Sequence, residues 1–393
     1  MMSEKIKLGI IGYGAQGGAY ARFIIEEGLV PSMEVGAICD IDPAKIEIIK
    51  EKYPDIPVYE NYQDMINSGD VDAIVTTVPH YLHPEMAMYA LDKGVHVMNE
   101  KPAAVYTKQV KELNEFAKGK DAVYAIMFNQ RNNPLYRKLK EILDSGDIGP
   151  IRRTNWIITT WWRPQAYYDQ SAWRATWGGE GGGVLVNQVP HQLDLIQWLA
   201  GIPETVYSRV QYGYQRDIAV EDQVHAIMTY PNGATGVLVT GTNEIIGSDH
   251  FEIVGDKGMI VVENSKKATV YRMKKSENEI NAEMDVDGVR RLFMGQMDMS
   301  EIYEVEVIEE KDESAGWGGQ HCGVFENFAQ HILNGEPLIA NGEEGINGVR
   351  LANGIHLSSW LGKEVSLTDF DDDLYLELLN DRIREEGKYE ERK

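Results

Sequence analysis

The first part of the chain alternates short apolar runs with segments of helical spacing. Five runs have the length and composition of strands: residues 7–11, 34–39, 73–77, 95–99 and 122–127. Four glycines, Gly28, Gly69, Gly94 and Gly119, stand where the intervening helices would end. Regular alternation of strands and helices predicts a parallel, doubly wound α/β sheet.

The pattern changes after Pro134. A helix is expected at 135–143, a strand near Ile151, and two antiparallel strands within 223–242, where "PNG" supplies a turn. Segments 325–335 and 342–361 have helical spacing, and we expect both to pack on this second, mainly antiparallel sheet. The chain of 393 residues is therefore divided into two domains, 1–128 and 129–393.

Charge and cysteine usage narrow the class of protein. Acidic residues outnumber basic ones by 62 to 38, which disfavours nucleic acid and anionic membranes as partners. Much of this charge lies in 275–313 and 369–393, which we interpret as solvated faces. The two cysteines, Cys39 and Cys322, have no metal-ligand spacing. With neither a signal peptide nor a membrane-spanning apolar run evident, a cytoplasmic protein is predicted.

The motif G-x-G-x-x-G follows the first predicted strand and opens a helix. Gly12 would make the tight turn, Gly14 would let the backbone approach a pyrophosphate, and Gly17 would let helix and strand pack closely. Ala15 and Gln16 complete the loop at the helix N-terminus, where unpaired amides favour a phosphate. This pattern predicts a dinucleotide-binding domain.

Asp40 ends the second predicted strand, in "VGAICDIDP". A carboxylate at that position accepts hydrogen bonds from both ribose hydroxyls and repels a 2′-phosphate. NAD is therefore the expected cofactor, and NADP is less favoured.

A second candidate site begins with Glu100, Lys101 and Pro102, which follow the predicted strand 95–99. Ligands of open α/β sheets bind beyond the carboxyl ends of the strands. A lysine there can bond a substrate hydroxyl and stabilise the charge that develops as the hydroxyl loses its proton. A solvated surface lysine is the alternative interpretation.

The run "GGEGGG" at 178–183 leads into Asn187, His191, Asp194 and Trp198, at spacings of four, three and four. Such spacings predict one helical face. His191 can accept a proton near neutral pH, and Asp194 could orient it or favour its charged form. A helix cap or a core histidine remains an alternative.

Segment 156–177 contains five tryptophans and two tyrosines. Aromatic faces cover the C–H surface of sugar rings while polar groups bond the hydroxyls, so Trp162, Arg163 and Arg174 are candidate substrate-binding residues. The arginines would also admit a carboxylate or phosphate on the substrate. An aromatic cluster of this kind is more often part of a core or a subunit interface.

His80 and His83 have a spacing that a metal could use, but no carboxylate or cysteine completes a ligand set, so no metal is expected. His321 begins a predicted helix and could face the substrate, although a capping or core role fits it too.

Taken in order, the N-terminal glycine motif, the Glu100-Lys101-Pro102 tripeptide, and the glycine run leading to His191 and Asp194 resemble the Gfo/Idh/MocA oxidoreductases. The likeness spans almost the whole chain. It implies a Rossmann domain followed by an α/β domain whose open sheet makes a homodimer or homotetramer, and it places the loop of His80 and His83 beside the cofactor.

The resemblance also implies oxidation or reduction of a secondary alcohol on a sugar, glycoside or polyol. Lys101 matches the lysine that contacts substrate and nicotinamide, and His191 matches the catalytic histidine. Many members have aspartate where this chain has Asn187, and asparagine cannot usefully accept a proton, so His191 is the expected base. Asn187 is interpreted as the mark of a subgroup that acts on glycosides and nucleotide sugars.

The preferred hypothesis is a glycoside or sugar 3-dehydrogenase, by analogy with that subgroup. An inositol dehydrogenase, a redox-neutral glycosidase that keeps its NAD, and a non-catalytic dinucleotide-binding sugar sensor are the alternatives. Retention of both Lys101 and His191 argues against the sensor.

Overall fold

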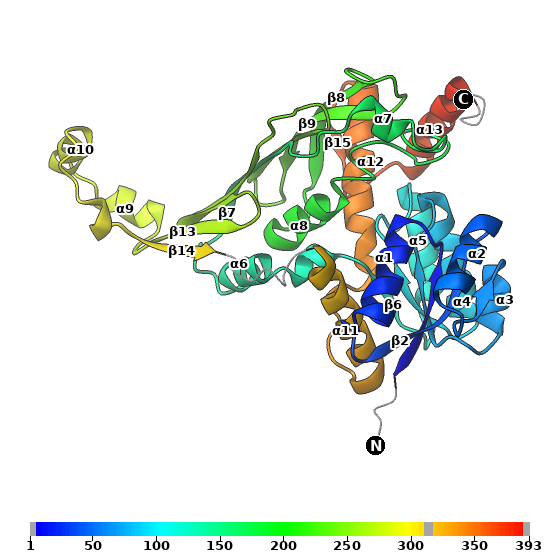
Figure 1. Cartoon of the computed structure of the whole chain (residues 1–393). Helices are drawn as coiled ribbons and strands as arrows, with labels where there is room; N and C mark the ends of the chain where they lie inside the picture. Colours follow the sequence, from blue (N-terminus) through cyan, green and yellow to red (C-terminus); the bar gives the residue numbers. More distant parts are fainter. Residues whose placement is uncertain (1–4, 310–316, 388–393) are drawn as a thin grey trace.

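The computed structural model describes residues 5–309 and 317–387. It contains two sheets, each with its own buried core (Figure 1). The predicted fold class, a Rossmann domain followed by an α/β domain with a mainly antiparallel sheet, is confirmed.

The first sheet is parallel throughout and has the order β3-β2-β1-β4-β5-β6. Its strands are β1 (Ile6–Ile11), β2 (Met33–Cys39), β3 (Val58–Tyr59), β4 (Ala73–Thr76), β5 (His96–Asn99) and β6 (Tyr124–Ile126). The connecting helices are α1 (Ala15–Ala21), which continues into η1 (Arg22–Glu26), α2 (Pro43–Lys52), α3 (Tyr62–Asn67), η2 (His80–Leu82), α4 (His83–Asp92) and α5 (Thr107–Ala117). The strand order reverses between β1 and β4, which is where ligands bind in this architecture.

The second sheet has nine strands in the order β14-β13-β12-β11-β7-β10-β9-β8-β15. They are β7 (Ile151–Ile158), β8 (Thr205–Tyr212), β9 (Glu221–Thr229), β10 (Thr235–Gly241), β11 (Asp249–Gly255), β12 (Gly258–Glu263), β13 (Lys267–Met273), β14 (Tyr303–Glu309) and β15 (Val365–Ser366). All neighbours are antiparallel except β7 and β10, which pair in parallel. The expected hairpin within 223–242 is formed by β9 and β10.

Within residues 5–309 and 317–387, helices cover one face of the second sheet. η3 (Asn129–Asn132), α6 (Pro134–Asp144), α7 (Gln165–Tyr168), α8 (Pro190–Ala200), α12 (Gly345–Leu361) and α13 (Asp372–Glu386) belong to this half. Side chains of α6, α8 and α12 share a core with the inward residues of the sheet, and Figure 1 shows α12 running alongside β8. On the other face, alternate residues such as Tyr207, Ile227, Val305 and Val307 are exposed. One face is thus a core, and no helix of the described residues covers the other.

The expectation that segment 325–335 packs on the second sheet is wrong. This segment belongs to α11 (Trp317–Asn334), whose Phe325 and Phe328 are buried with Leu8 and Ile10 in the core of the first sheet. Helical spacing defines an apolar face but not the sheet that receives it. The companion segment does pack as expected, because Leu351 of α12 is buried in the second core.

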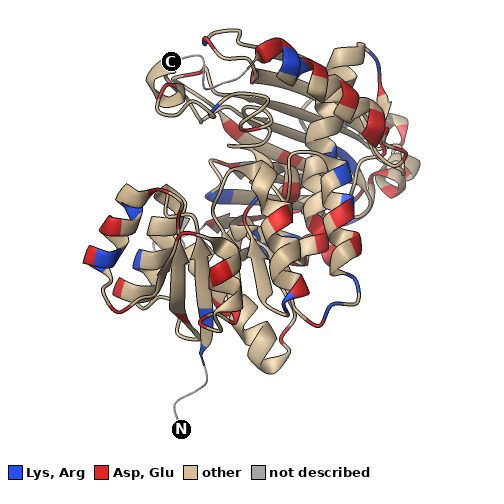
Figure 2. Cartoon of the chain, turned by 90° about the vertical axis from the view of Figure 1, so that its right-hand side faces the viewer, with Lys and Arg blue, Asp and Glu red and all other residues tan. Residues whose placement is uncertain are grey.

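The acidic segments lie largely on the outside. α9 (Glu277–Glu283) and α10 (Val286–Phe293) project from the β13–β14 end of the sheet, followed by η4 (Met299–Glu301) (Figure 1). Gly288 is the one buried residue of these three elements. Residues 310–313 and 388–393 of the acidic segments lie outside the described residues. Acidic side chains are scattered over both domains (Figure 2), and among the described residues no helix has the length and apolar character needed to cross a membrane.

Candidate active site

The glycine loop between β1 and α1 has three different steric requirements. Gly12 has φ +95°, and an added Cβ would lie 2.5 Å from the carbonyl oxygen of Thr77. A Cβ on Gly17 would lie 2.0 Å from the carbonyl oxygen of Gly12. A Cβ on Gly14 would meet no protein atom within 4 Å. Gly12 and Gly17 are therefore required by the fold, whereas Gly14 leaves open space beside the loop.

Asp40 lies at the end of β2, next to this loop, and is 6% exposed. Its carboxylate accepts hydrogen bonds from the backbone N–H of Tyr13 at 2.6 Å and of Asp42 at 2.9 Å. Lys45 Nζ is 3.4 Å from Oδ2. The carboxylate is thus held rigidly against the glycine loop.

Glu100 and Lys101 follow β5, as expected. Glu100 accepts a hydrogen bond from the hydroxyl of Tyr20, and burial raises the pKa of its carboxyl group. Lys101 Nζ donates to the backbone carbonyl of Asn187 at 3.1 Å. Burial lowers the pKa of Lys101, and the negative charges of Glu100 and Glu180 partly oppose that shift. This contact joins the end of β5 to the segment that precedes α8.

His191 lies in the first turn of α8, and its Nδ1 has no hydrogen-bond partner among the described residues. Burial lowers the pKa of the imidazole well below its usual value, with smaller contributions from Lys101 and His321. A neutral imidazole is the form of histidine that can accept a proton.

The predicted role of Asp194 in orienting His191 is wrong. Asp194 forms a two-point ion pair with Arg131, whose Nε and Nη2 lie 2.8 and 2.6 Å from its carboxylate oxygens. Both side chains are 3% exposed. The expected single helical face is also incomplete, since α8 begins at Pro190 and Asn187 lies in the turn before it. A helical face identifies neighbours on one element, not the partner from another.

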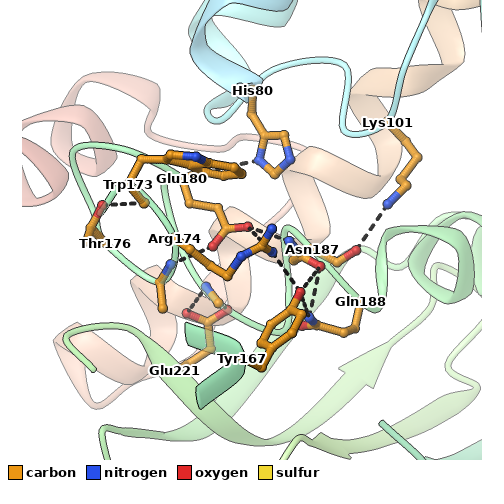
Figure 3. Close-up of polar contacts among 12 residues, drawn as sticks. His80, Lys101, Tyr167, Trp173, Arg174, Thr176, Glu180, Asn187, Gln188 and Glu221 are labelled. Carbon is orange, nitrogen blue, oxygen red and sulfur yellow. Dashed lines mark hydrogen bonds and ion pairs between the residues drawn. The ribbon is translucent and has the colours of Figure 1, made fainter. Parts of the chain in front are cut away.

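The side-chain amide of Asn187 contacts the glycine run, the adjacent Gln188 and α7 (Figure 3). Its Nδ2 donates to Oε1 of Glu180, and its Oδ1 accepts from Gln188 Nε2 at 2.8 Å and from the hydroxyl of Tyr167 at 3.4 Å. Glu180 was not identified from the sequence as a site residue. Its position inside the glycine run is the sequence feature that could have identified it as a site residue.

These elements enclose a cavity of about 480 Å³ between the two domains. Nine residues singled out in the sequence line it: Gln16, His80, His83, Glu100, Lys101, Arg163, Asn187, His191 and His321. Seven further residues line it that no sequence motif indicated: Thr77, Val78, Asn129, Gln130, Trp161, Gln188 and Gln192. The cavity brings the switch point of the first sheet together with the start of α8.

Two of the proposed substrate-binding residues lie elsewhere. Trp162 is 38% exposed and does not line this cavity, whereas its neighbour Trp161 does. Arg174 lines an adjacent cavity of about 670 Å³, and its Nη1 donates to the hydroxyl of Tyr167 at 2.7 Å.

Part of the aromatic segment is core. Trp156 is fully buried and stacks on Phe251, and Trp177 is 3% exposed and packs against His356 and Trp360. The core interpretation therefore holds for these two tryptophans.

His80 and His83 are held by backbone carbonyls. His80 Nδ1 lies 3.1 Å from the carbonyl oxygen of Glu180, and His83 bridges the carbonyls of Pro102 and Val78, at 2.9 Å each. Burial lowers the pKa of both imidazoles. Within residues 5–309 and 317–387, no three His, Cys, Asp or Glu side chains gather as a metal site would require.

Comparison with known proteins gives two family matches. Residues 6–128 match the model of the oxidoreductase family with an NAD-binding Rossmann fold, and residues 136–261 match the GFO/IDH/MocA C-terminal domain.

Individual relatives include YdgJ of Escherichia coli K12, an uncharacterized oxidoreductase. It is 30% identical over 236 residues, which cover 58% of this chain and 63% of YdgJ, less than two thirds of its length. Inositol 2-dehydrogenase of Salmonella typhimurium is 27% identical over 288 residues, covering 70% of this chain and 79% of that protein.

Levoglucosan dehydrogenase of Pseudarthrobacter phenanthrenivorans is 25% identical over 288 residues, covering 66% of this chain and 73% of that protein. A solved levoglucosan dehydrogenase in complex with NADH and levoglucosan superposes with a TM-score of 0.75 at 20% identity, over 93% of this chain and 100% of that one. At that identity, the structural likeness concerns the fold.

Proposed function

Because the chain belongs to the Gfo/Idh/MocA oxidoreductases and carries their NAD-binding Rossmann domain, we propose that it interconverts a secondary alcohol and a ketone on a sugar, glycoside or polyol. The observation that carries this proposal is the cavity in which Lys101, Asn187 and His191 meet the residues of the dinucleotide-binding side. Residues 1–128 would bind the cofactor, and residues 129–393 the substrate and a second subunit.

In the oxidation direction, His191 takes the proton of the substrate hydroxyl, because its imidazole is neutral and lines the cavity. Lys101 stabilises the oxygen as negative charge develops on it, and burial strengthens that interaction. Asn187 anchors Lys101 through its backbone carbonyl and offers its side-chain oxygen to a hydroxyl. Bound NAD supplies the acceptor for the hydride.

The cofactor would lie along the first domain. The open space at Gly14 allows close approach of a pyrophosphate to the loop of Gly12, Ala15, Gln16 and Gly17. Asp40 would accept the ribose hydroxyls, which favours NAD over NADP. Glu100, His80 and His83 would border the nicotinamide end, since they line the same cavity as Lys101.

The substrate class follows from the cavity and from the relatives named for inositol and levoglucosan. Trp161 and Arg163 in the cavity wall supply an apolar face and a cation. Arg174 and Trp162 would contact only a substrate that extends beyond it. We favour a glycoside, oxidised at its 3-hydroxyl, over a free inositol.

The experiment follows the absorbance of NADH while the protein and NAD are mixed with inositols, free sugars and aryl glucosides. Growth of the band with one substrate class, reduced at least about 100-fold in His191→Ala, supports the proposal. His331→Ala is the matched control, because His331 lies on α11 away from the cavity and should leave the rate unchanged. No band with any substrate, despite tight NAD binding, would refute net dehydrogenation and favour the redox-neutral glycosidase.

We further propose that the uncovered face of the second sheet joins two copies of the chain as a homodimer, or four as a homotetramer. Tyr207 and Ile227 are directly opposite each other on β8 and β9, and both are about half exposed. Val305 and Val307, on β14 at the other end of the sheet, are also exposed on this face. Light scattering should give a mass at least twice that of the chain, and Ile227→Glu should yield a monomer. A monomeric wild type would refute this assembly.

A further inference from the structure

Glu180 is the buried carboxylate that fixes the turn before α8. It is 1% exposed, and its Oε2 accepts a hydrogen bond from the backbone N–H of Ala175 at 2.7 Å. Its Oε1 accepts from Nδ2 of Asn187 and lies 3.9 Å from Nη1 of Arg174 (Figure 3). Ala175 has φ +52°, a strained conformation for alanine, so the first contact also holds a demanding turn. One carboxylate oxygen of Glu180 therefore accepts from the backbone, and the other accepts from Asn187.

The contact with Glu180 decides how the amide of Asn187 is turned. An ionised carboxylate offers only acceptors, so it selects the N–H end of the amide. The oxygen end then faces Gln188 and Tyr167, on the side of the cavity that Asn187 lines. With its amide turned this way, Asn187 can accept a hydrogen bond from a substrate hydroxyl that replaces the long 3.4 Å contact from Tyr167.

The same contact explains why asparagine stands at position 187. An aspartate there would place two carboxylates in hydrogen-bond contact, and such a pair avoids repulsion only by sharing one proton. Arg174, whose Nη1 lies 3.9 Å from Glu180 Oε1, offsets part of that repulsion, but this Nη1 donates to Tyr167, and Lys101 Nζ donates to the backbone of residue 187. Residues 180 and 187 therefore form a matched acceptor and donor.

We infer that Glu180 is a positioning residue that makes asparagine obligatory at 187, orients its amide toward the substrate, and leaves the proton transfer to His191. The inference rests on the proposed function. Glu180 is not itself placed to take the substrate proton, because Asn187 rather than Glu180 lines the cavity.

The test is a cycle of Glu180→Gln, Asn187→Asp and the double variant. Glutamine is the right replacement at position 180, because its oxygen can still accept from Ala175 N–H and protect the turn. In Asn187→Asp, we expect kcat/KM for the alcohol to fall about 100-fold at pH 7, as the repelled side chain leaves its position. In the double variant, the new amide at position 180 donates to the new carboxylate at position 187. Donor and acceptor are then exchanged, and kcat/KM should recover to within about fivefold of wild type.

Glu221→Gln is the matched control. Glu221, the first residue of β9, is another buried carboxylate, but it accepts from the backbone of Gly183 and Leu185 and has no hydrogen bond with Asn187. Combined with Asn187→Asp, it should give no recovery. Recovery with Glu221→Gln, no recovery with Glu180→Gln, or an Asn187→Asp enzyme as active as wild type would each overturn the inference.

Thermal unfolding distinguishes this inference from the proposed function, because it needs no substrate. In Asn187→Asp, the shared proton raises the folded-state pKa of the carboxyl pair above its unfolded value. The pair is then tolerated at low pH, and stability is lost as pH rises through the folded-state pKa. The thermal unfolding midpoint of Asn187→Asp, relative to that of wild type, should therefore decrease as the pH is raised from about 5 to about 8. This decrease should vanish in the double variant. A pH-independent difference would overturn the pairing even if wild type oxidised no substrate.

Discussion

Replacing Asp194 tests whether this carboxylate stabilises the fold through its ion pair with Arg131 or acts in catalysis through His191. Asp194→Asn keeps the shape of the side chain but removes its charge, which leaves the guanidinium of Arg131 buried at 3% exposure. Losing one partner of a buried pair costs about 3–5 kcal/mol of unfolding free energy. Glu344, 2.7 Å from Nη1 of Arg131 and 41% exposed, still offsets part of that charge. We therefore expect about 3 kcal/mol, or a midpoint lower by roughly 6–12 °C.

The assay compares thermal or urea unfolding with the pH profile of kcat/KM. Glu344→Gln is the control, because a partly exposed pair with the same guanidinium contributes only about 0.5 kcal/mol. Since Asp194 does not contact His191, the acid limb of the pH profile should stay in place. An Asp194→Asn protein of unchanged stability whose acid limb moves would refute the assignment and restore a role in orienting His191.

Three further predictions concern the catalytic residues and the cofactor loop. The pKa of His191 lies below its usual 6.5 and that of Lys101 below its usual 10.5. The rate constant kcat/KM for oxidation should therefore fall on the acid side only below pH 6.5, as His191 gains a proton, and on the alkaline side before pH 10.5, as Lys101 loses one. An acid limb between pH 6.5 and about 8 that disappears in His191→Ala would contradict this prediction. Gly14→Ala should fold normally but bind NADH at least about tenfold more weakly, as measured by fluorescence titration. Gly17→Ala should instead lose stability, because its Cβ would lie 2.0 Å from a carbonyl oxygen of the same loop. Equal stability of the two variants would contradict the steric assignment. Asp40→Ala should reduce the ratio of kcat/KM with NAD to kcat/KM with NADP at least about tenfold, because a charge that repels the 2′-phosphate is removed. An unchanged ratio would assign the selectivity to another residue.

The sequence by itself determined the features that depend on the local pattern of apolar residues and glycines and on the order of the elements along the chain. Alternating apolar runs and helical segments specified the parallel sheet, and a right-handed crossover topology then placed both the glycine loop and Lys101 at the carboxyl edge of that sheet. Gly12 and Gly17 could be assigned because only glycine tolerates such close approach of backbone atoms.

Only the tertiary structure decided which partner each of the other side chains meets. The spacing of His191 and Asp194 placed them on one helix, but Arg131, 63 residues from Asp194, determines what that carboxylate does. The apolar face of α11 fitted either core, and packing assigned it to the first. Glu180 looked like one acidic residue among glycines until folding brought it against Asn187. Periodicity fixes the direction of a side chain relative to its own element, whereas its partner depends on contacts between distant segments, which local sequence does not encode.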